Sequence, residues 1–297
     1  MSRILLQTTI TAQPDDWNIG RFSLLAAELS AAGHDVVARD RAHHGDDPIL
    51  SVLDDLAFDQ LWLMAVDTGD GLTDTEADAI MKFRRGGGGV LTARDHQDLG
   101  CCLTRLGSLG HVNEFQDKTV DQSHLCDDRD TPPTISWPNY HSGANGDYQP
   151  VLATDPVHPL LRTSQSASGR IEWFPAHPHE GAVSASVPCA TVVAQGRSSA
   201  SGRRFNLAVA IDGETSDGLP MGRALAESTF HHFADYNWDL GCGGAPSFVS
   251  ETPGTQILAD PARLVVFKDY VRNVAEWLHP GIRAYPAAPP MTHVSLS

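Results

Sequence analysis

The sequence predicts an α/β fold, with a flavodoxin-like parallel sheet that carries helices on both faces. Short apolar runs alternate with helical patterns through residues 1–100, and the loops between them are short. Strands that alternate with helices in this way pair in parallel. The runs are almost continuously apolar, which is typical of parallel strands that are buried on both faces.

The first strand, helix and second strand follow this pattern closely. Residues 4–9 (ILLQTT) are predicted to form a buried strand. Apolar residues at helical spacing over 22–29 predict a helix, and Gly33 stands where glycine commonly ends one. Residues 35–40 (DVVARD) then predict the second strand.

The same alternation continues as far as residue 93. Thr73 and Glu76 match a capping box, which predicts the start of a helix that ends at the glycines of 86–89. Around this helix we expect a helical segment at 48–57 and strands at 60–66 and 90–93.

The second half of the chain is less regular. Residues 110–150 are polar and long for a connector, so we expect an inserted, lid-like subregion there. Asp260 and Pro261 predict the start of a last helix. We expect a single domain over 1–280, further strands near 190–195, 205–211 and 223–229, and a Pro- and Ala-rich tail at 281–297.

Composition excludes several classes of function. The 297 residues include 37 acidic and 21 basic side chains, which gives a formal net charge of −16. Such a surface repels phosphates, so we expect no nucleic-acid partner and no membrane partner. Five cysteines without a CxxC pair, behind a start that lacks signal-peptide features, favour a cytoplasmic location. A homo-oligomer is compatible with this composition.

The first candidate site follows the predicted strand 90–93 directly, as RDHQDLG over 94–100. Consecutive ionisable side chains cannot continue a buried strand, so we place them at its carboxyl end, where ligands bind. Arg94 and Gln97 are candidates for substrate binding. Asp95 and His96 are candidates for a catalytic base and acid.

Two further segments add histidines. In FPAHPHEG (174–181), His177 and His179 face the same way if the segment is extended, and Glu180 is a further catalytic candidate. In STFHHFADYNWD (228–239), we expect His231 or His232 to touch a ligand, with Tyr236 as part of the pocket wall.

Other candidates depend on a lid or on a metal ion. His141 would reach the substrate if the insertion closes over the site. A divalent metal, with zinc as the first choice, is the cofactor that the imidazole and carboxylate groups favour. The candidate metal ligands are His96, Asp98, His177, His179 and His232.

Four stretches resemble the ThuA-like branch of the class I glutamine amidotransferase-like fold. They are 15–17 with 31–36 (DDW and AAGHDV), 72–96 (LTDTEADAIMKFRRGGGGVLTARDH), 222–232 (GRALAESTFHH) and the closing helix up to Trp277. The resemblance implies a flavodoxin-like sheet with a site above the fourth strand, and a link to sugar utilisation that points to a carbohydrate-like ligand.

The chain departs from the glutaminases of that fold. They place a nucleophilic cysteine at the turn after the fourth strand, where this chain has Arg94 and Asp95. The FPAHPHEG segment matches their later His-x-Glu arrangement only in part. We therefore expect no release of ammonia from glutamine.

Three functions stay open on this basis. We favour an enzyme, a hydrolase or a lyase, that acts on a small polar molecule through Asp95 and His96. The second interpretation arranges the same residues around a divalent metal as a metal-dependent hydrolase. The third is a non-catalytic module for small-molecule binding or assembly that kept the fold and lost the cysteine.

Overall fold

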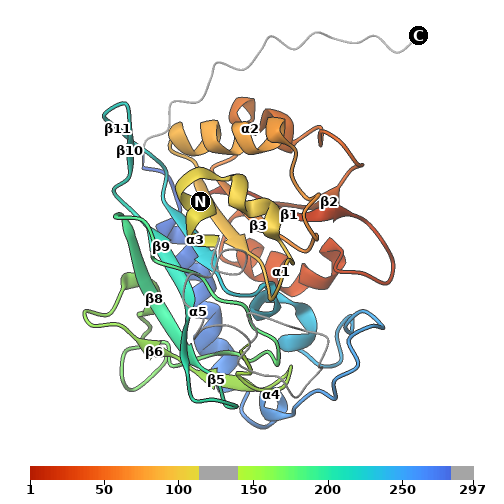
Figure 1. The fold of residues 1–297 in the computed structure, drawn as a ribbon. Helices are drawn as coiled ribbons and strands as arrows, with labels where there is room; N and C mark the ends of the chain where they lie inside the picture. Colours follow the sequence, from red (N-terminus) through yellow and green to blue (C-terminus); the bar gives the residue numbers. More distant parts are fainter. Residues whose placement is uncertain (114–139, 282–297) are drawn as a thin grey trace.

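The computed structural model describes residues 1–113 and 140–281, and its centre is one eight-stranded sheet (Figure 1). Five strands run parallel: β1 (Arg3–Thr11), β2 (Asp35–Arg41), β3 (Gln60–Met64), β4 (Gly89–Ala93) and β12 (Ala224–Glu227). Three more are each antiparallel to a neighbour: β6 (Leu152–Ala153), β8 (Ala190–Arg197) and β9 (Arg204–Ile211). The order across the sheet is β2-β1-β3-β4-β12-β9-β8-β6.

The predicted α/β class and flavodoxin-like sheet are confirmed. The antiparallel strands of the sheet were not predicted. The short turn between β8 and β9 makes them a hairpin, which forces antiparallel pairing. β12 then lies between β9 and β4, and it is parallel to β4 alone. The central sheet is therefore mixed.

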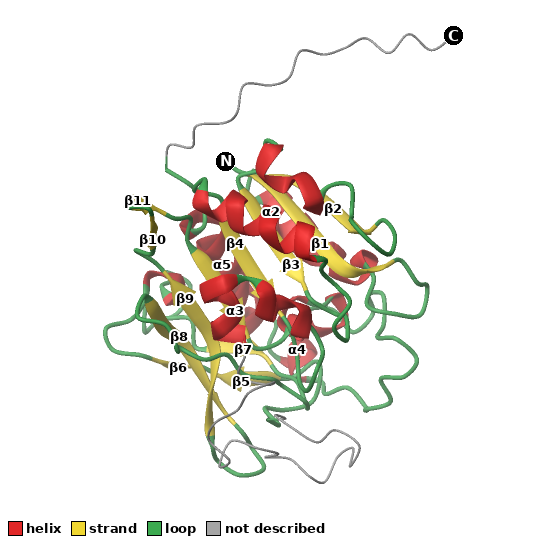
Figure 2. Ribbon diagram, turned by 45° about the horizontal axis from the view of Figure 1, so that its top comes forward, coloured by secondary structure: helices red, strands yellow, loops and turns green. Residues whose placement is uncertain are grey.

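Helices cover both faces of the sheet (Figure 2). α1 (Ser23–Ala31) and α5 (Ala262–Trp277) pack on one face through Leu25 and Phe267. On the other face lie α2 (Asp74–Arg85), α3 (Gly107–Asn113) and the 3₁₀ helix η2 (Leu50–Asp55). The segment expected to be helical at 48–57 is thus a 3₁₀ helix.

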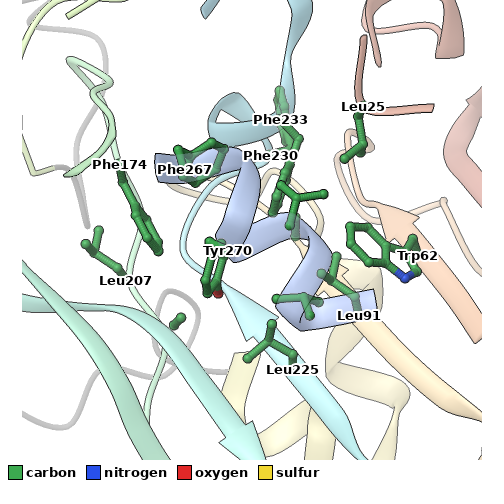
Figure 3. Close-up of a cluster of buried hydrophobic side chains, with 14 of the residues drawn as sticks. Leu25, Trp62, Leu91, Phe174, Leu207, Leu225, Phe230, Phe233, Phe267 and Tyr270 are labelled. Carbon is green, nitrogen blue, oxygen red and sulfur yellow. The ribbon is translucent and has the colours of Figure 1, made fainter. Parts of the chain in front are cut away.

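The two hydrophobic cores follow from strand alternation. In β1, Ile4 and Leu6 belong to the core under α1 and α5, whereas Leu5 belongs to the core under α2. Because successive side chains point to opposite faces, one continuous apolar run supplies both cores. In Figure 3, Phe267 and Tyr270 of α5 lie beside Phe174 over the sheet, and the centroid of Phe174 is 4.6 Å from that of Tyr270.

Local sequence signals fix the ends of the helices. The capping box is present: Thr73 Oγ1 accepts a hydrogen bond from the backbone N–H of Glu76, and the Glu76 carboxylate accepts one from the N–H of Thr73. At α1, the backbone N–H groups of Ser23 and Leu24 donate to the carboxylate of Asp235. Asp235 thereby ties the segment after β12 to the start of α1.

The remaining elements are short. The 3₁₀ helices are η1 (Ile19–Phe22), η3 (Cys101–Arg105), η5 (Pro159–Leu161), η6 (Phe230–Phe233) and η7 (Asp235–Asn237). The helix α4 (Gln256–Ala259) stands near β5 (Tyr148–Pro150), which pairs with β7 (Trp173–Pro175), and β10 (Thr215–Ser216) pairs with β11 (Leu219–Pro220). Most of the predicted insertion (114–139) and the tail from 282 lie outside the described residues. Among the described helices, none has the length and apolar character needed to cross a membrane.

Candidate metal centre

The site lies at the carboxyl ends of β4 and β12, which are neighbours in the sheet. Asp95 stands two residues beyond β4, and His231 lies in η6, just after β12. His177 approaches from the segment that follows β7. This is the edge at which open α/β sheets bind ligands.

Three imidazoles surround the carboxylate of Asp95, which has no exposed surface. Its Oδ2 lies 3.3 Å from Nε2 of His231, 3.5 Å from Nε2 of His177 and 3.4 Å from Nδ1 of His96. Neither oxygen of Asp95 has a hydrogen bond of ordinary geometry within the described part of the chain. A buried carboxylate that lacks such donors needs a cation to compensate its charge.

Outer partners set the orientation of the two inner histidines. Oδ1 of Asn145 lies 2.7 Å from Nδ1 of His177, and because an amide oxygen only accepts, Nδ1 carries the proton. Nε2 of His177 therefore turns a lone pair towards Asp95. The hydroxyl of Tyr236 lies 2.7 Å from Nδ1 of His231 and can accept in the same way. Such partners commonly orient metal-binding histidines.

The spacing of these atoms fits a metal ion. Asp95, His177 and His231 each offer one ligand atom, and the three atoms lie within 4.8 Å of one another. Ligand atoms around a tetrahedral zinc at about 2.0–2.2 Å are roughly 3.3–3.5 Å apart. The distances from Oδ2 of Asp95 to the nitrogens of His177 and His231 fall in that range. Among residues 1–113 and 140–281, Asp95, His177 and His231 are the one group of three or more acidic, His or Cys residues with this geometry.

The protonation states are also those of metal ligands. Burial alone would raise the pKa of Asp95, but the imidazoles of His96, His177 and His231 outweigh it and hold the pKa well below its usual value. Burial lowers the pKa of His177 well below the ordinary imidazole value, and burial also lowers that of His96. An ionised Asp95 and a neutral His177 are the states in which these two groups bind a divalent metal.

His96 stands at the rim of the cluster. Its side chain keeps 14% of its surface exposed, and its Nδ1 has no hydrogen bond within the described residues. Its ring stacks near that of His179, with 5.8 Å between centroids. Nε2 of His179 in turn lies 3.1 Å from Oε1 of Glu251. His96 is thus placed to contact a reactant, while His179 is held from outside.

Hydrogen bonds from Arg94 hold the loop that follows β4. Its buried guanidinium donates to the backbone carbonyls of Gln97, Leu99 and Asn113. At Gly100, which has φ of 72°, a Cβ would stand 2.6 Å from Cβ of Arg94. Glycine is therefore required where the loop passes over the arginine. This geometry gives Arg94 a positioning role, in contrast to the substrate-binding role expected from the sequence.

A second buried cluster lies beneath the site. Nε2 of His232 is 3.2 Å from Glu180, its Nδ1 is 3.4 Å from Glu227, and the hydroxyl of Tyr270 donates to Glu227. Burial would lower the pKa of His232, but its hydrogen bonds to Glu180 and Glu227 raise it to about 9. Burial raises the pKa of both carboxyls. His232 is therefore an imidazolium at neutral pH.

This cluster bears on two sequence candidates. His232 lies between two carboxylates and is not one of the three residues whose ligand atoms lie within 4.8 Å of one another, so the structure places it apart from the metal-binding group. Glu180 has no exposed surface, and it accepts hydrogen bonds from Ser142 and Gln149. Glu180 is therefore joined through Ser142 to the segment that carries His177.

The other candidates lie around the metal cluster. Asp98 is exposed and is not part of the metal-binding group. Gln97 lies at the turn after β4 with φ of 52°, and Nδ1 of His141 is 3.0 Å from the carbonyl of Pro178. Tyr236 contacts His231 and not the centre itself. His177 and His179 lie close together, with ring centroids 5.9 Å apart, but only His177 faces Asp95.

Three residues of this region were not candidates from the sequence. Asn145 lies in a turn-forming stretch, Glu251 lies in a loop with no regular pattern, and Glu227 ends a short apolar strand. Of the three, only Glu227 could have been identified from the sequence, because a carboxylate in an apolar strand needs a partner. The pairing of the other two with histidines depends on chain segments that are distant in the sequence.

Comparison with known proteins identifies a similar fold but does not assign the chain to a family. No protein-family model matches the sequence, and no curated protein shows a significant match. One solved structure, a protein described as ThuA-like from Parabacteroides merdae, aligns with a TM-score of 0.51 at 14% identity over 96% of this chain and 92% of its own. The chain resembles a ThuA-like protein in fold.

A second solved structure is more distant. It is a cytoplasmic protein from Salmonella typhimurium LT2, with a TM-score of 0.48 and 10% identity over 93% of this chain and 99% of its own. At these identities, the likeness extends to the fold alone. The chemistry of the site therefore depends on the residues described above.

Proposed function

We propose that the protein is a metal-dependent hydrolase that acts on a small polar molecule. Asp95, His177 and His231 bind one divalent ion, with zinc as the first choice, and leave a coordination position for water or substrate. Catalytic zinc sites commonly have three protein ligands in this way. The observation that carries the proposal is the buried carboxylate of Asp95, which faces three imidazole nitrogens at 3.3–3.5 Å.

The residues divide the chemistry between them. A bound ion supplies Lewis acidity and lowers the pKa of a coordinated water to about 7. His96, neutral and at the rim, accepts the proton of the attacking water and returns it to the leaving group. Asn145 and Tyr236 keep the two inner imidazoles turned towards the ion.

The site favours this function over the other two interpretations. Acid–base catalysis without a metal would leave the lone pairs of His177 and Asp95 facing each other at 3.5 Å with nothing between them. A plain binding module would not need a buried carboxylate that lacks hydrogen-bond donors. As part of the same proposal, we expect that the protein has no glutaminase activity, lies in the cytoplasm and forms a homo-oligomer.

A substrate screen on metal-loaded protein tests the proposal. Protein treated with a chelator and reloaded with zinc, manganese or cobalt is assayed with small chromogenic esters, phosphodiesters and glycosides. We expect turnover that requires the metal, that Asp95→Asn abolishes and that His96→Gln lowers by about 10²–10⁴-fold. Asp78→Asn, at an exposed position of α2, is the matched control and should be as active as the wild type. Turnover that persists in Asp95→Asn would contradict the assignment.

A further inference from the structure

A cavity of about 260 Å³ adjoins the histidine cluster. Its lining includes the polar side chains of Asn145, Tyr236, Ser247 and Glu251. Asn145, Tyr236 and Glu251 each contact a different histidine of the region, at 2.7 Å, 2.7 Å and 3.1 Å respectively. A molecule in the cavity therefore lies one side chain away from the imidazoles of the proposed metal centre.

The rest of the lining is mainly apolar and is held in place. Leu240, Pro246 and Val249 supply most of it. The loop that carries them is tied down where the backbone N–H of Ser247 donates to Asp15 at 2.7 Å. The cavity thus combines an apolar lining with a few polar side chains, as small-molecule subsites do.

The charge of the lining favours a positively charged donor. The carboxylate of Glu251 accepts from His179 and is the charged group of the cavity wall. The Glu251 side chain keeps 29% of its surface exposed. Nδ2 of Asn145, which has no partner within the described residues, adds a donor for a ligand oxygen.

We infer that this cavity binds the non-reacting end of the substrate, and that this end is an ammonium group on a short aliphatic body. The ammonium would meet Glu251, and the aliphatic part would lie against Leu240 and Val249. This inference rests on the proposed function, since it treats the cavity as a subsite of the metal centre. Binding energy at such a remote position serves to orient the reacting group.

Three short-chain probes test the ligand chemistry: butylammonium, butanol and butyrate. Each is titrated into chelator-treated protein at pH 7, and the backbone amide resonances of residues 240–253 are followed by NMR. We expect butylammonium to bind about five-fold tighter than butanol, which is the effect of one partly exposed ion pair. Butyrate should not bind. Equal affinity for butyrate, or shifts that map elsewhere, would overturn the inference.

Two variants and one control locate the effect. Glu251→Gln keeps an acceptor for His179 but removes the charge, so it should erase the preference for the amine over the alcohol. Val249→Phe should fill the cavity and weaken both ligands. Glu172→Gln removes an exposed carboxylate outside the cavity and should change neither.

The experiment distinguishes failure of the proposed subsite from failure of the proposed metal centre. Zinc uptake is measured on the same samples by calorimetry, without any of the three probes. Zinc binding without amine binding would overturn the subsite and leave the metal centre intact. Amine binding without zinc uptake would contradict the metal centre, while the ligand chemistry of the cavity would stand.

Discussion

His177 and His231 stack face to face, with 3.5 Å between their ring centroids and 12° between their planes. Burial, reinforced by the neighbouring His231, lowers the pKa of His177 well below its usual value. Both rings turn Nε2 towards the same oxygen of Asp95. The stack therefore presents two imidazole nitrogens and one carboxylate oxygen to the same small region.

Acid should destabilise the metal-free protein through this stack. Burial lowers the pKa of His177 in the folded state, so its contribution to stability is present above the ordinary value of about 6.5 and is lost as pH falls below it. We expect the urea midpoint to fall between pH 7.5 and 5.5, and His177→Gln to flatten that dependence. An equal slope in the variant would show that another group is responsible.

Asn145 should act through His177. Asn145→Ala removes the acceptor that fixes the proton on Nδ1, so zinc affinity should fall by about 10–100-fold. Asn145→Asp keeps an acceptor and should restore most of the affinity. Competition with a chromophoric chelator measures both. A loss in Asn145→Asp as large as that in Asn145→Ala would point to a packing effect instead.

Arg94 should matter for stability and not for substrate recognition. Lysine cannot reproduce three diverging donors, so Arg94→Lys should lower the free energy of unfolding by about 2 kcal/mol. KM for any substrate found should stay within about two-fold of the wild type once the variant is folded and loaded with metal. Arg85→Lys, at an exposed position of α2, is the control. A selective rise in KM would restore the substrate-binding role.

His232 should stabilise the fold from beneath the site. Its pKa of about 9 lies above the ordinary value of 6.5, so the stabilisation is complete below about pH 6.5 and is lost as pH rises through 9. His232→Gln leaves Glu180 and Glu227 without their cation and should cost about 3 kcal/mol at pH 7. Urea unfolding from pH 6 to 10 measures it, with His44→Gln at an exposed position as the control. A variant as stable as the wild type at pH 7 would contradict this role.

The sequence predicted the longer strands because a continuous apolar run is a local signal, whereas the two- and three-residue strands β5, β6, β7, β10 and β11 were not predicted. The segment after 90–93 was placed correctly at the edge of the sheet, since consecutive charged residues cannot enter a buried strand. The antiparallel pairing of β8 and β9 was not predicted, because apolar runs of that length do not encode direction.

The choice between adjacent histidines could not be predicted. His231 and His232 lie in the 3₁₀ helix η6, where successive side chains are about 120° apart. One therefore faces Asp95 and the other faces Glu180 and Glu227. The cluster that each joins is decided by tertiary packing, and the same holds for the contacts of Asn145 and Glu251.

The metal content of the protein tests the central claim most directly. Protein purified without a His tag is analysed by mass spectrometry before and after treatment with a chelator, next to Asp95→Asn. We predict about one zinc or similar ion per chain, lost on chelation, regained on titration, and absent from Asp95→Asn. A chain that carries no metal, and that gains no thermal stability when zinc is added, would contradict the assignment of Asp95, His177 and His231 as a metal centre.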